Sequence, residues 1–190
     1  MTKEEGDAVY DAYFRAFPDL KNYFAREKAK SLESGYILIS TVTKRKSYLP
    51  GFARYSELAA QISGHFWEEY RSEKKIGSER FREMKRTIQD FFYFKGDIER
   101  KSLNYPIQGS SAEVTKISCI YIFDYIVEND LFGLVKFVNT IHDENVLECP
   151  VEIAEETAAK VREFMCAAGD IYCKRVSLVA DPDISFHWRK

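Results

Sequence analysis

The chain has 190 residues, 45% of them hydrophobic, and a formal net charge of −2. This length fits one domain, or one domain with a small subdomain, and the composition is enough for a buried core rather than a disordered chain. The near-neutral charge excludes a protein that binds nucleic acid through a basic field over its whole surface. Local basic strips would still be able to bind it.

Cysteine usage and hydropathy indicate the compartment. The four cysteines show no C-x-x-C spacing, and a chain of this size does not need a disulfide framework, which indicates a reducing compartment. The sequence shows no signal peptide and no apolar run of about eighteen residues. It therefore predicts a cytoplasmic protein that is not secreted and does not contact a membrane.

The N-terminal half is expected to be helical around one short extended pair. Thr2 and Glu5 form a capping-box pattern that begins a helix, and Pro18 begins a second helix that Gly35 ends. The apolar stripe of the first helix contains Val9, Tyr10, Tyr13, Phe14 and Phe17. Two extended segments, residues 36–42 and 47–49, and two helices, residues 53–72 and 78–94, follow.

The C-terminal half contains the longest expected helix, from Ser110 to Asn129. Two strands, residues 134–140 and 145–149, come next and are separated by a short polar turn. A helix over residues 151–168 and a strand over about 175–180 complete the chain. The buried candidates of the long helix are Val114, Ile117, Ile120, Tyr121 and Tyr125. Helices that alternate with short antiparallel strands predict an α+β fold, with helices packed on a small antiparallel sheet.

The turn His142-Asp143-Glu144 places two carboxylates and an imidazole between apolar strands. A single aspartate in a turn needs no function, because its side chain bonds the local backbone. Two adjacent carboxylates repel each other unless a cation or a basic partner offsets their charge. The residues alone leave metal binding and a solvated turn as equal alternatives.

A two-metal site for phosphoryl transfer needs carboxylates from at least two strands, since neighbours on one strand point to opposite faces. Asp143 can face the metals while Glu144 faces away. No second aspartate is convincing, because Asp97 and Asp124 fit a loop and a helix face better. A small metal phosphoesterase centred on His142 and Asp143 is disfavoured for the same reason.

Arg100, Asn104 and Gln108 are spaced at four, which would place them on one face of a helix. Pro106 is expected to interrupt that helix, with Asn104 at a bend and Gln108 near the start of the long helix. Amide side chains in such a place can read the edges of stacked bases. Ordinary helix capping is the commoner use of these residue types and is favoured on the residues alone.

Basic residues occur in two further places. Thr43-Lys44-Arg45-Lys46 is a loop between the two extended segments, where either a phosphate backbone or water can surround the charges. Between Arg71 and Arg86 the basic residues alternate with glutamates, which is typical of a solvated helix face. Near the C-terminus, Trp188 is large and apolar and is expected to dock into the core.

Five segments match, in order, the motifs of one protein family. Phe14-Arg15-Ala16-Phe17-Pro18 is similar to Y-F-x-x-[FY]-P, and residues 35–50, with Thr41, are similar to G-Y-V-x-T-x-x-G-R-R-R-x-x-P. Residues 97–116 resemble E-R-x-x-x-N-x-P-I-Q-G-[TS]-A-A-D-x-x-K. Ile141-His142-Asp143-Glu144 resembles a V-H-D-E turn, and residues 181–188 a closing W segment. The chain thus resembles the family A (polymerase-I type) DNA polymerases over almost its whole length.

The resemblance implies roles for single residues. Asp143 matches a metal-binding aspartate and Glu144 the acidic residue beside it, and both are expected to be catalytic. His142 matches a residue that approaches the primer terminus. Asn104 and Gln108 match minor-groove and template contacts, and Arg100 matches a positive anchor near them. The basic loop of Lys44, Arg45 and Lys46 matches one on the fingers side. The expected DNA-binding residues are His142, Gln108, Asn104, Arg100, Lys44, Arg45 and Lys46. No nucleotide-binding residue is carried over.

Some positions depart from the family pattern. Lys44 stands where the family usually has Gly and Lys46 where it has Arg, while Ser111 and Glu113 replace Ala and Asp. Two family segments find no match in this sequence. One is the D-Y-S-Q-I-E-L-R strand, which supplies the other catalytic aspartate. The other is the R-x-x-x-K-x-x-x-[FY]-x-x-x-Y-G helix, which grips the incoming triphosphate.

The resemblance therefore implies a partial palm with part of the fingers. Residues 1–95 would hold distal fingers-side helices and the basic hairpin, and residues 96–190 the palm portion with the His-Asp-Glu turn. The expected function is that of a C-terminal fragment or subunit of a template-directed DNA polymerase, which uses Mg²⁺, primer–template DNA and dNTPs. It is expected to be inactive alone and to join the missing N-terminal half, in cis or in trans.

One alternative function and two further expectations complete the sequence analysis. A stand-alone module would bind duplex or primer–template DNA without catalysis, with a salt-sensitive affinity. Apolar surface left exposed by the missing strands would drive self-association. The family further implies the cytoplasm of a bacterial or phage-infected cell.

Overall fold

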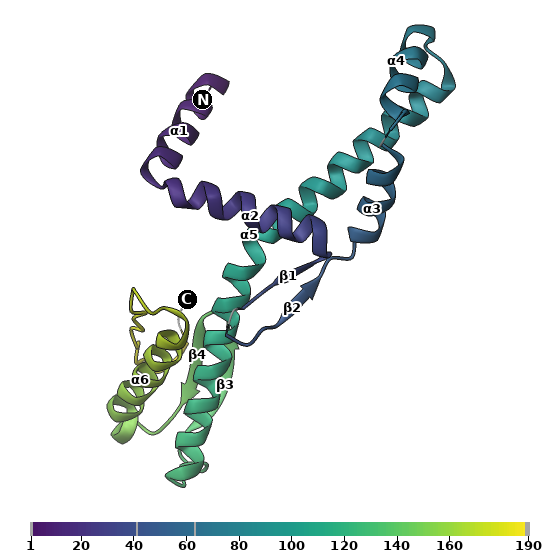
Figure 1. Cartoon of the computed structure of the whole chain (residues 1–190). Helices are drawn as coiled ribbons and strands as arrows, with labels where there is room; N and C mark the ends of the chain where they lie inside the picture. The colour runs from purple at the N-terminus through teal and green to yellow at the C-terminus, as the bar shows by residue number, and fades with distance from the viewer. Residues whose placement is uncertain (1, 41, 63, 189–190) are drawn as a thin grey trace. The chain divides into compact units, whose positions relative to one another are not determined.

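The structure is a computed structural model that describes residues 2–40, 42–62 and 64–188, so Thr41 of the hairpin motif lies outside the described residues. Its elements form two compact units. Unit 1 consists of Met1–Ile39 and Arg45–Pro106, and unit 2 of Ser40–Lys44 and Ile107–Lys190. The chain is mostly helical with two short antiparallel sheets, which confirms the predicted α+β class (Figure 1).

Unit 1 begins with α1 (Lys3–Ala16), and its first turn confirms the capping box. The Glu5 amide donates to Thr2 Oγ1 at 3.3 Å, and the Thr2 amide donates to the Glu5 carboxylate at 2.7 Å. No residue of α1 is buried within the described structure. Most of the predicted apolar stripe is instead exposed, namely Val9, Tyr10, Tyr13 and Phe17.

The second helix, α2 (Pro18–Ser34), begins at the predicted proline and ends at Gly35. Gly35 has a φ of +73°, a left-handed conformation that glycine adopts without steric cost. A Cβ atom at this position would lie 2.5 Å from the Phe52 ring. Both the backbone conformation and the available space therefore require glycine where the chain enters the first hairpin.

The helix predicted over residues 53–72 is wrong, because two shorter helices occupy this region. They are α3 (Phe52–Gln61) and α4 (Phe66–Ile76). Gly64 lies between them at a φ of +65°. A left-handed residue cannot continue a right-handed helix, and the apolar periodicity on either side concealed this break.

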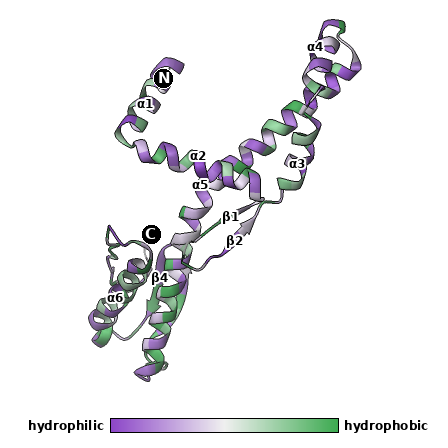
Figure 2. Ribbon diagram, in the orientation of Figure 1, coloured by the Kyte–Doolittle hydropathy of each residue, from purple (hydrophilic) through white to green (hydrophobic). Residues whose placement is uncertain are grey.

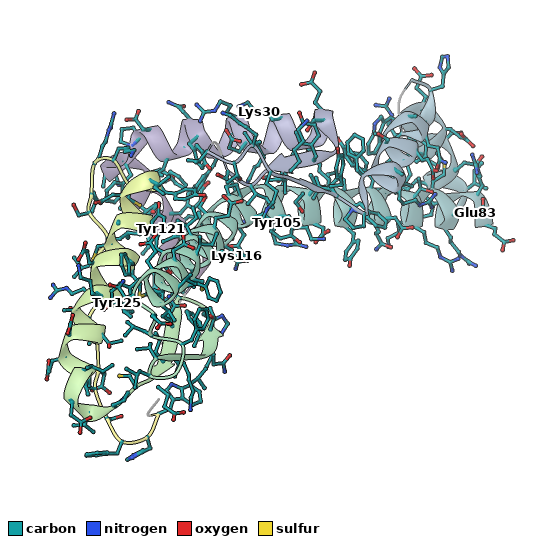
Figure 3. All side chains as sticks on the ribbon, turned by 90° about the horizontal axis from the view of Figure 1, so that it is seen from below. Lys30, Glu83, Tyr105, Lys116, Tyr121 and Tyr125 are labelled. Atoms are coloured by element: carbon teal, nitrogen blue, oxygen red, sulfur yellow. The ribbon has the colours of Figure 1, made fainter. Side chains whose placement is uncertain are left out.

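The region after α4 also differs from the prediction. Instead of separate helices at 78–94 and 110–129, the structure has one helix, α5 (Glu79–Glu128), with Pro106 inside it. Proline inside a helix costs about 3 kcal/mol. Tyr105, labelled in Figure 3, packs on the core of unit 1, and Glu113 is buried in unit 2. Tertiary contacts on both sides of the proline thus outweigh its local cost.

The core of unit 1 lies under a two-stranded sheet, β1 (Tyr36–Leu38) and β2 (Lys46–Tyr48). The strands are antiparallel and pair Ile37 with Ser47. β1 is shorter than predicted, whereas β2 has the predicted length but begins one residue earlier, so Lys46 belongs to β2 rather than to the loop. The buried residues of this core are Ile37, Leu49 and Ile98, with Leu32, Phe52, Tyr55 and Tyr105 packed against them.

Unit 2 contains the second hairpin, β3 (Lys136–Ile141) and β4 (Glu144–Glu148), beside the C-terminal part of α5 (Figure 1). A short 3₁₀ helix, η1 (Val151–Ile153), leads into α6 (Ala154–Tyr172). Tyr121 and Tyr125 of α5 both contact the Phe164 ring of α6 (Figure 3). The buried core residues are Ile122, Ile126 and Val135.

Two predictions for unit 2 are wrong. Ile120 of α5 is 56% exposed rather than buried. Residues 175–180 form no strand and pair with neither of the two sheets of the described structure. Instead, Leu178 packs against Gly169 of α6, where a Cβ atom would lie 2.8 Å from the leucine Cβ. The extended segment around Leu178 therefore packs on a glycine of α6. The strand-like pattern of its sequence gives no sign of this contact.

Among the helices of the described structure, none has the length and apolar character needed to cross a bilayer. Along α5, the division between the two compact units falls after Pro106. The division at residue 95 into a fingers side and a palm portion is a functional assignment, and it stays a prediction.

Candidate active site

The predicted acidic turn is the tip of the β3–β4 hairpin. Ile141 and Glu144 form the last pair of the ladder, so His142 and Asp143 are the two residues of the turn. His142 has a φ of +52°, a conformation that is uncommon without glycine but several-fold enriched in histidine, asparagine and aspartate. The side chains of His142, Asp143 and Glu144 are all exposed. The hairpin thus presents two carboxylates and an imidazole to solvent.

Buried polar residues of α5 hold this turn from behind. Thr115 Oγ1 donates to the backbone carbonyl oxygen of His142 at 3.3 Å, and Asn145 Nδ2 donates to Ser118 Oγ at 2.9 Å. Thr115 is 5% exposed and Ser118 is 0% exposed. The sequence did not lead us to predict these anchors. The signal was present as two small polar residues spaced by three on an otherwise apolar helix face.

The C-terminal segment reaches the same turn. Trp188 Nε1 donates to Glu144 Oε1 at 2.8 Å, and the indole is 53% exposed. The expectation that Trp188 docks into the core is therefore wrong. Its polar N–H group, rather than its apolar area, determines its position, and it engages the carboxylate beside Asp143.

The turn offers part of a metal site. Carboxylate oxygens are the ligands that Mg²⁺ prefers, and Asp143 and Glu144 present them on one hairpin. Successive residues of a strand point to opposite faces, so these neighbours are not expected to converge on one ion. Within the described parts of the chain, no group of three or more His, Cys, Asp or Glu side chains could hold a metal. Asp143 can supply one ligand, and the remaining ligands must come from elsewhere.

Arg100 and Asn104 lie in the continuous helix α5, and Gln108 follows one turn later. The expected bend at Asn104 and the capping roles are therefore wrong, because these residues are in a helix interior. Their spacing of four places Arg100 and Asn104 on one exposed face. Among the described residues, the side chains of Asn104 and Gln108 form no hydrogen bond, so both amides are available to an external partner.

Asp97 organises the charges at the start of the third motif. Its carboxylate accepts a hydrogen bond from Lys101 Nζ at 2.6 Å, and this bond raises the pKa of Lys101. Arg100 Nη2 lies 3.6 Å from the same carboxylate, but its side chain is 70% exposed. Asp97 thus serves as an anchor for two cations, and Arg100 keeps most of its surface open to solvent.

The basic tip of the first hairpin is held by a buried carboxylate. Thr43 Oγ1 donates to both oxygens of Glu113 at 2.8 and 3.0 Å, and Tyr172 Oη donates to Glu113 Oε2 at 2.7 Å. Glu113 is 5% exposed. The neighbouring Lys44 has a φ of +60°, at the position where the family motif has glycine. These contacts fix the tip and leave the side chain of Lys44 exposed.

Lys46 has a local partner. Its Nζ lies 4.1 Å from the centroid of the Tyr36 ring, across the β1–β2 pair. This cation–π contact orients the ammonium group without neutralising it. The structure does not gather Lys44, Arg45 and Lys46 into one cluster, since Lys46 belongs to a strand and the other two to the loop.

Known proteins with related sequences are bacterial DNA polymerases I. The chain is 27% identical over 188 residues to DNA polymerase I of Streptococcus pneumoniae, a match that covers 99% of this chain and 17% of the relative. It is 24% identical over 188 residues to that of Pseudomonas aeruginosa, with 99% and 16% covered. The match to that of Aquifex aeolicus is 34% over 97 residues, with 51% and 17% covered. The chain spans about a sixth of the length of the Streptococcus pneumoniae and Pseudomonas aeruginosa relatives.

The fold is similar to the polymerase domain of Pol1 from M. smegmatis, solved in complex with a DNA primer-template and dNTP. The TM-score is 0.59 at 23% identity, and the match covers 88% of this chain and 23% of that chain. This likeness defines the fold class as a portion of a polymerase domain. The model of DNA polymerase family A matches residues 1–190. The chain belongs to DNA polymerase family A, which confirms the family that its motifs predict.

Proposed function

We propose that this chain supplies the C-terminal palm and part of the fingers of a template-directed DNA polymerase. The observation that carries the proposal is the exposed His142-Asp143-Glu144 turn, which stands on buried contacts to α5. Membership of DNA polymerase family A supports it. The reaction of the whole enzyme would be nucleotide addition: the primer 3′ oxygen bonds to the α-phosphorus of a dNTP, and pyrophosphate leaves.

Within this reaction, the hairpin tip would act on the reacting groups. Asp143 would be the ligand that this chain contributes to the catalytic metals, with Mg²⁺ as the expected cation. Such metals lower the charge of the phosphate oxygens and activate the attacking hydroxyl. Glu144, held by Trp188, would support the turn as the second acidic residue. His142 would approach the primer terminus.

The DNA contacts would come from α5 and the first hairpin. Asn104 and Gln108 have unused amide groups, and amides can bond base edges in the minor groove as well as the sugar–phosphate backbone. Arg100, only loosely paired with Asp97, would contact the backbone nearby. The basic residues of the first hairpin would bind phosphates, namely Lys44, Arg45 and Lys46.

The remaining part of the polymerase would be the partner of this chain, in cis or in trans. Unit 2 exposes apolar side chains on α5, on the loop that follows it and on β3, namely Ile120, Phe123, Val127, Phe132, Leu134 and Val138. Each of these side chains is at least 46% exposed. Figure 2 shows the hydrophobic colouring of this part of α5. Since the matched relatives are about six times longer, we propose that other polymerase segments cover these side chains, and that the isolated chain self-associates through them.

Primer extension tests this function. The chain is assayed with labelled primer–template, dNTPs and Mg²⁺, alone and after co-expression with the preceding part of a family A polymerase domain. We expect extension only from the combined protein, because the described residues hold no group of three or more His, Cys, Asp or Glu that could bind a metal, and the family's triphosphate-gripping helix finds no match in this sequence. Extension by the chain alone would contradict its proposed incompleteness. A well-folded combined protein that binds DNA but never extends the primer would favour the stand-alone DNA-binding module.

A further inference from the structure

In unit 1, α5 carries an exposed stripe of cationic and aromatic side chains. Arg82, Arg86, Tyr93 and Arg100 are separated by four, seven and seven residues, which places them within about 40° of one another around an α-helix. All four are exposed, including 66% of Tyr93 and 70% of the Arg100 side chain. At about 1.5 Å per residue they extend along roughly 27 Å of the helix.

The opposite face of this helix segment is covered within the same unit. Met84 and Ile98 are each 1% exposed, and Phe91 stacks on Tyr55 of α3 with ring centroids 5.6 Å apart. These residues lie half a helical turn from the stripe. Packing of unit 1 therefore orients α5 so that the arginines and Tyr93 face solvent.

The charges around the stripe are not evenly mixed, although the sequence predicts a solvated face of alternating signs. Glu69 and Glu83 both bind Arg80, at 2.8 and 3.3 Å. The hydrogen bond from Arg80 also lowers the pKa of the Glu69 carboxyl. Across the described residues, no carboxylate lies within ion-pair distance of Arg82 or Arg86. Glu69 and Glu83 thus pair with Arg80 rather than with Arg82 or Arg86, and those two guanidinium groups remain available to an anionic ligand although the exposed Glu79 and Asp90 lie on the same helix.

The chemistry of the stripe fits a single DNA strand. Proteins that bind single strands combine cations that follow the phosphates with exposed aromatic rings on which bases stack. Tyr93 lies between Arg86 and Arg100, and the neighbouring Phe92 is also 56% exposed. At its other end the stripe reaches Arg100, one turn before Asn104. It is therefore continuous with the residues proposed to contact the template.

We propose that this stripe binds the single-stranded part of the template, and so extends the DNA-binding surface of α5 well beyond Arg100. The inference rests on the proposed function for the identity of the strand. The affinity itself depends only on the exposed groups of unit 1. The expected substrate is unpaired DNA of any sequence, because phosphate contacts and stacking do not read base edges.

Fluorescence anisotropy with the full chain tests the stripe, with a fluorescein-labelled single-stranded oligonucleotide and a blunt duplex of the same sequence as probes. The Arg82→Ala/Arg86→Ala variant should reduce the slope of log K against log salt by about 1.4 on the single strand, since each phosphate contact contributes about 0.7. Tyr93→Ala should weaken binding at least about fivefold through lost stacking, and Tyr93→Phe should retain the affinity. Arg162→Ala/Lys174→Ala is the matched control, because it removes two exposed cations from unit 2.

The proposal is overturned by three outcomes. In the first, the stripe variants show the same salt slope and the same affinity as the wild-type chain or the control variant. Another is a loss confined to the duplex, and the third is no single-strand binding by the wild-type chain at low salt. The primer-extension experiment does not depend on the stripe. A chain that restores extension while its stripe variants bind DNA normally would therefore refute only the stripe.

Discussion

The two hairpins of this chain have connections of different length, residues 39–45 in the first and 142–143 in the second, and their tips are held in different ways. Each tip has one non-glycine residue at positive φ, Lys44 at +60° and His142 at +52°. The first tip is fixed by a side chain, because Thr43 donates to the buried Glu113 carboxylate. The second is fixed by its backbone, because Thr115 donates to the carbonyl oxygen of His142.

This difference shows how exposed charged groups can be placed accurately on short turns. In both hairpins the chemically active residues are exposed, and small or buried polar residues of α5 determine their position. In its contacts with α5 the first tip depends on the one carboxylate of Glu113, beside the Val42 and Thr43 amides that donate to Ser40 Oγ within the loop. The second tip has separate anchors at Thr115 and Asn145. Single substitutions should therefore affect the first anchor more than either anchor of the second.

The largest expected effect concerns the exposed carboxylate rather than any anchor. Asp143→Asn keeps the size of the side chain and removes its charge. It should slow single-turnover dNTP incorporation by the combined polymerase by about a thousandfold or more, since a metal ligand stabilises the transition state by several kcal/mol. The affinity for primer–template should stay within about threefold.

The control for this variant is Glu148→Gln, which removes a carboxylate from the far end of β4, where it pairs with Lys136 at 3.8 Å. We expect a normal rate from it. A loss of DNA affinity that accounts for the slower rate of Asp143→Asn would show that this residue acts in binding and not in catalysis.

Glu113→Ala should give the next largest effect, on stability. It leaves the Thr43 and Tyr172 hydroxyl groups without the acceptor they now share, and we expect the free energy of unfolding to fall by about 2–3 kcal/mol. Urea unfolding of the chain measures this change. Glu128→Ala, at an exposed position of the same helix, should cost less than about 0.5 kcal/mol. If Glu113→Ala and Glu128→Ala unfolded at the same urea concentration, Glu113 would be excluded as an anchor of the first hairpin.

Asn145→Ala should have a smaller effect. It removes the hydrogen bond to Ser118 and the contacts of Asn145 Oδ1 with Cys119 Sγ and Thr140 Oγ1, at a cost of about 1–2 kcal/mol. Because Thr115 still holds His142, amide hydrogen exchange at the tip should increase only moderately. Exchange at the rate of an unfolded chain would show that the two anchors are not independent.

The smallest expected effect is that of Trp188→Phe. The substitution keeps an aromatic ring and removes the N–H group that donates to Glu144. Since the indole is half exposed, water can replace the donor, and the incorporation rate should change by less than about threefold. A loss as large as that of Asp143→Asn would assign Trp188 and Glu144 a far more direct part in the reaction.

The sequence predicted the elements whose signals are local. The capping box at Thr2, the helix end at Gly35 and the turn at His142 depend on residue types at fixed short spacings, and all are present. Gly64 escaped notice because apolar periodicity on both sides concealed a single left-handed residue. The family motifs added a role for the acidic turn, since its residues alone fit metal binding and a solvated turn equally well.

Errors occurred where distant contacts override a local rule. Pro106 should end a helix, yet packing at Tyr105 and Glu113 keeps α5 continuous. Trp188 was assigned to the core from its apolar area, but its N–H group finds Glu144, 44 residues away. The anchors at Thr115 and Ser118 were missed because two small polar residues spaced by three on an apolar helix face do not by themselves show that this face packs on the hairpin.

Anomalous diffraction from crystals of the combined polymerase, bound to primer–template, dNTP and Mn²⁺, would locate the metal directly. We expect a Mn²⁺ peak within coordination distance, about 2.1 Å, of a carboxylate oxygen of Asp143, and no such peak in the Asp143→Asn variant. The other ligands should belong to the part of the enzyme that precedes this chain. A fully occupied metal site with no ligand from the β3–β4 turn would contradict the proposed role of this chain in catalysis.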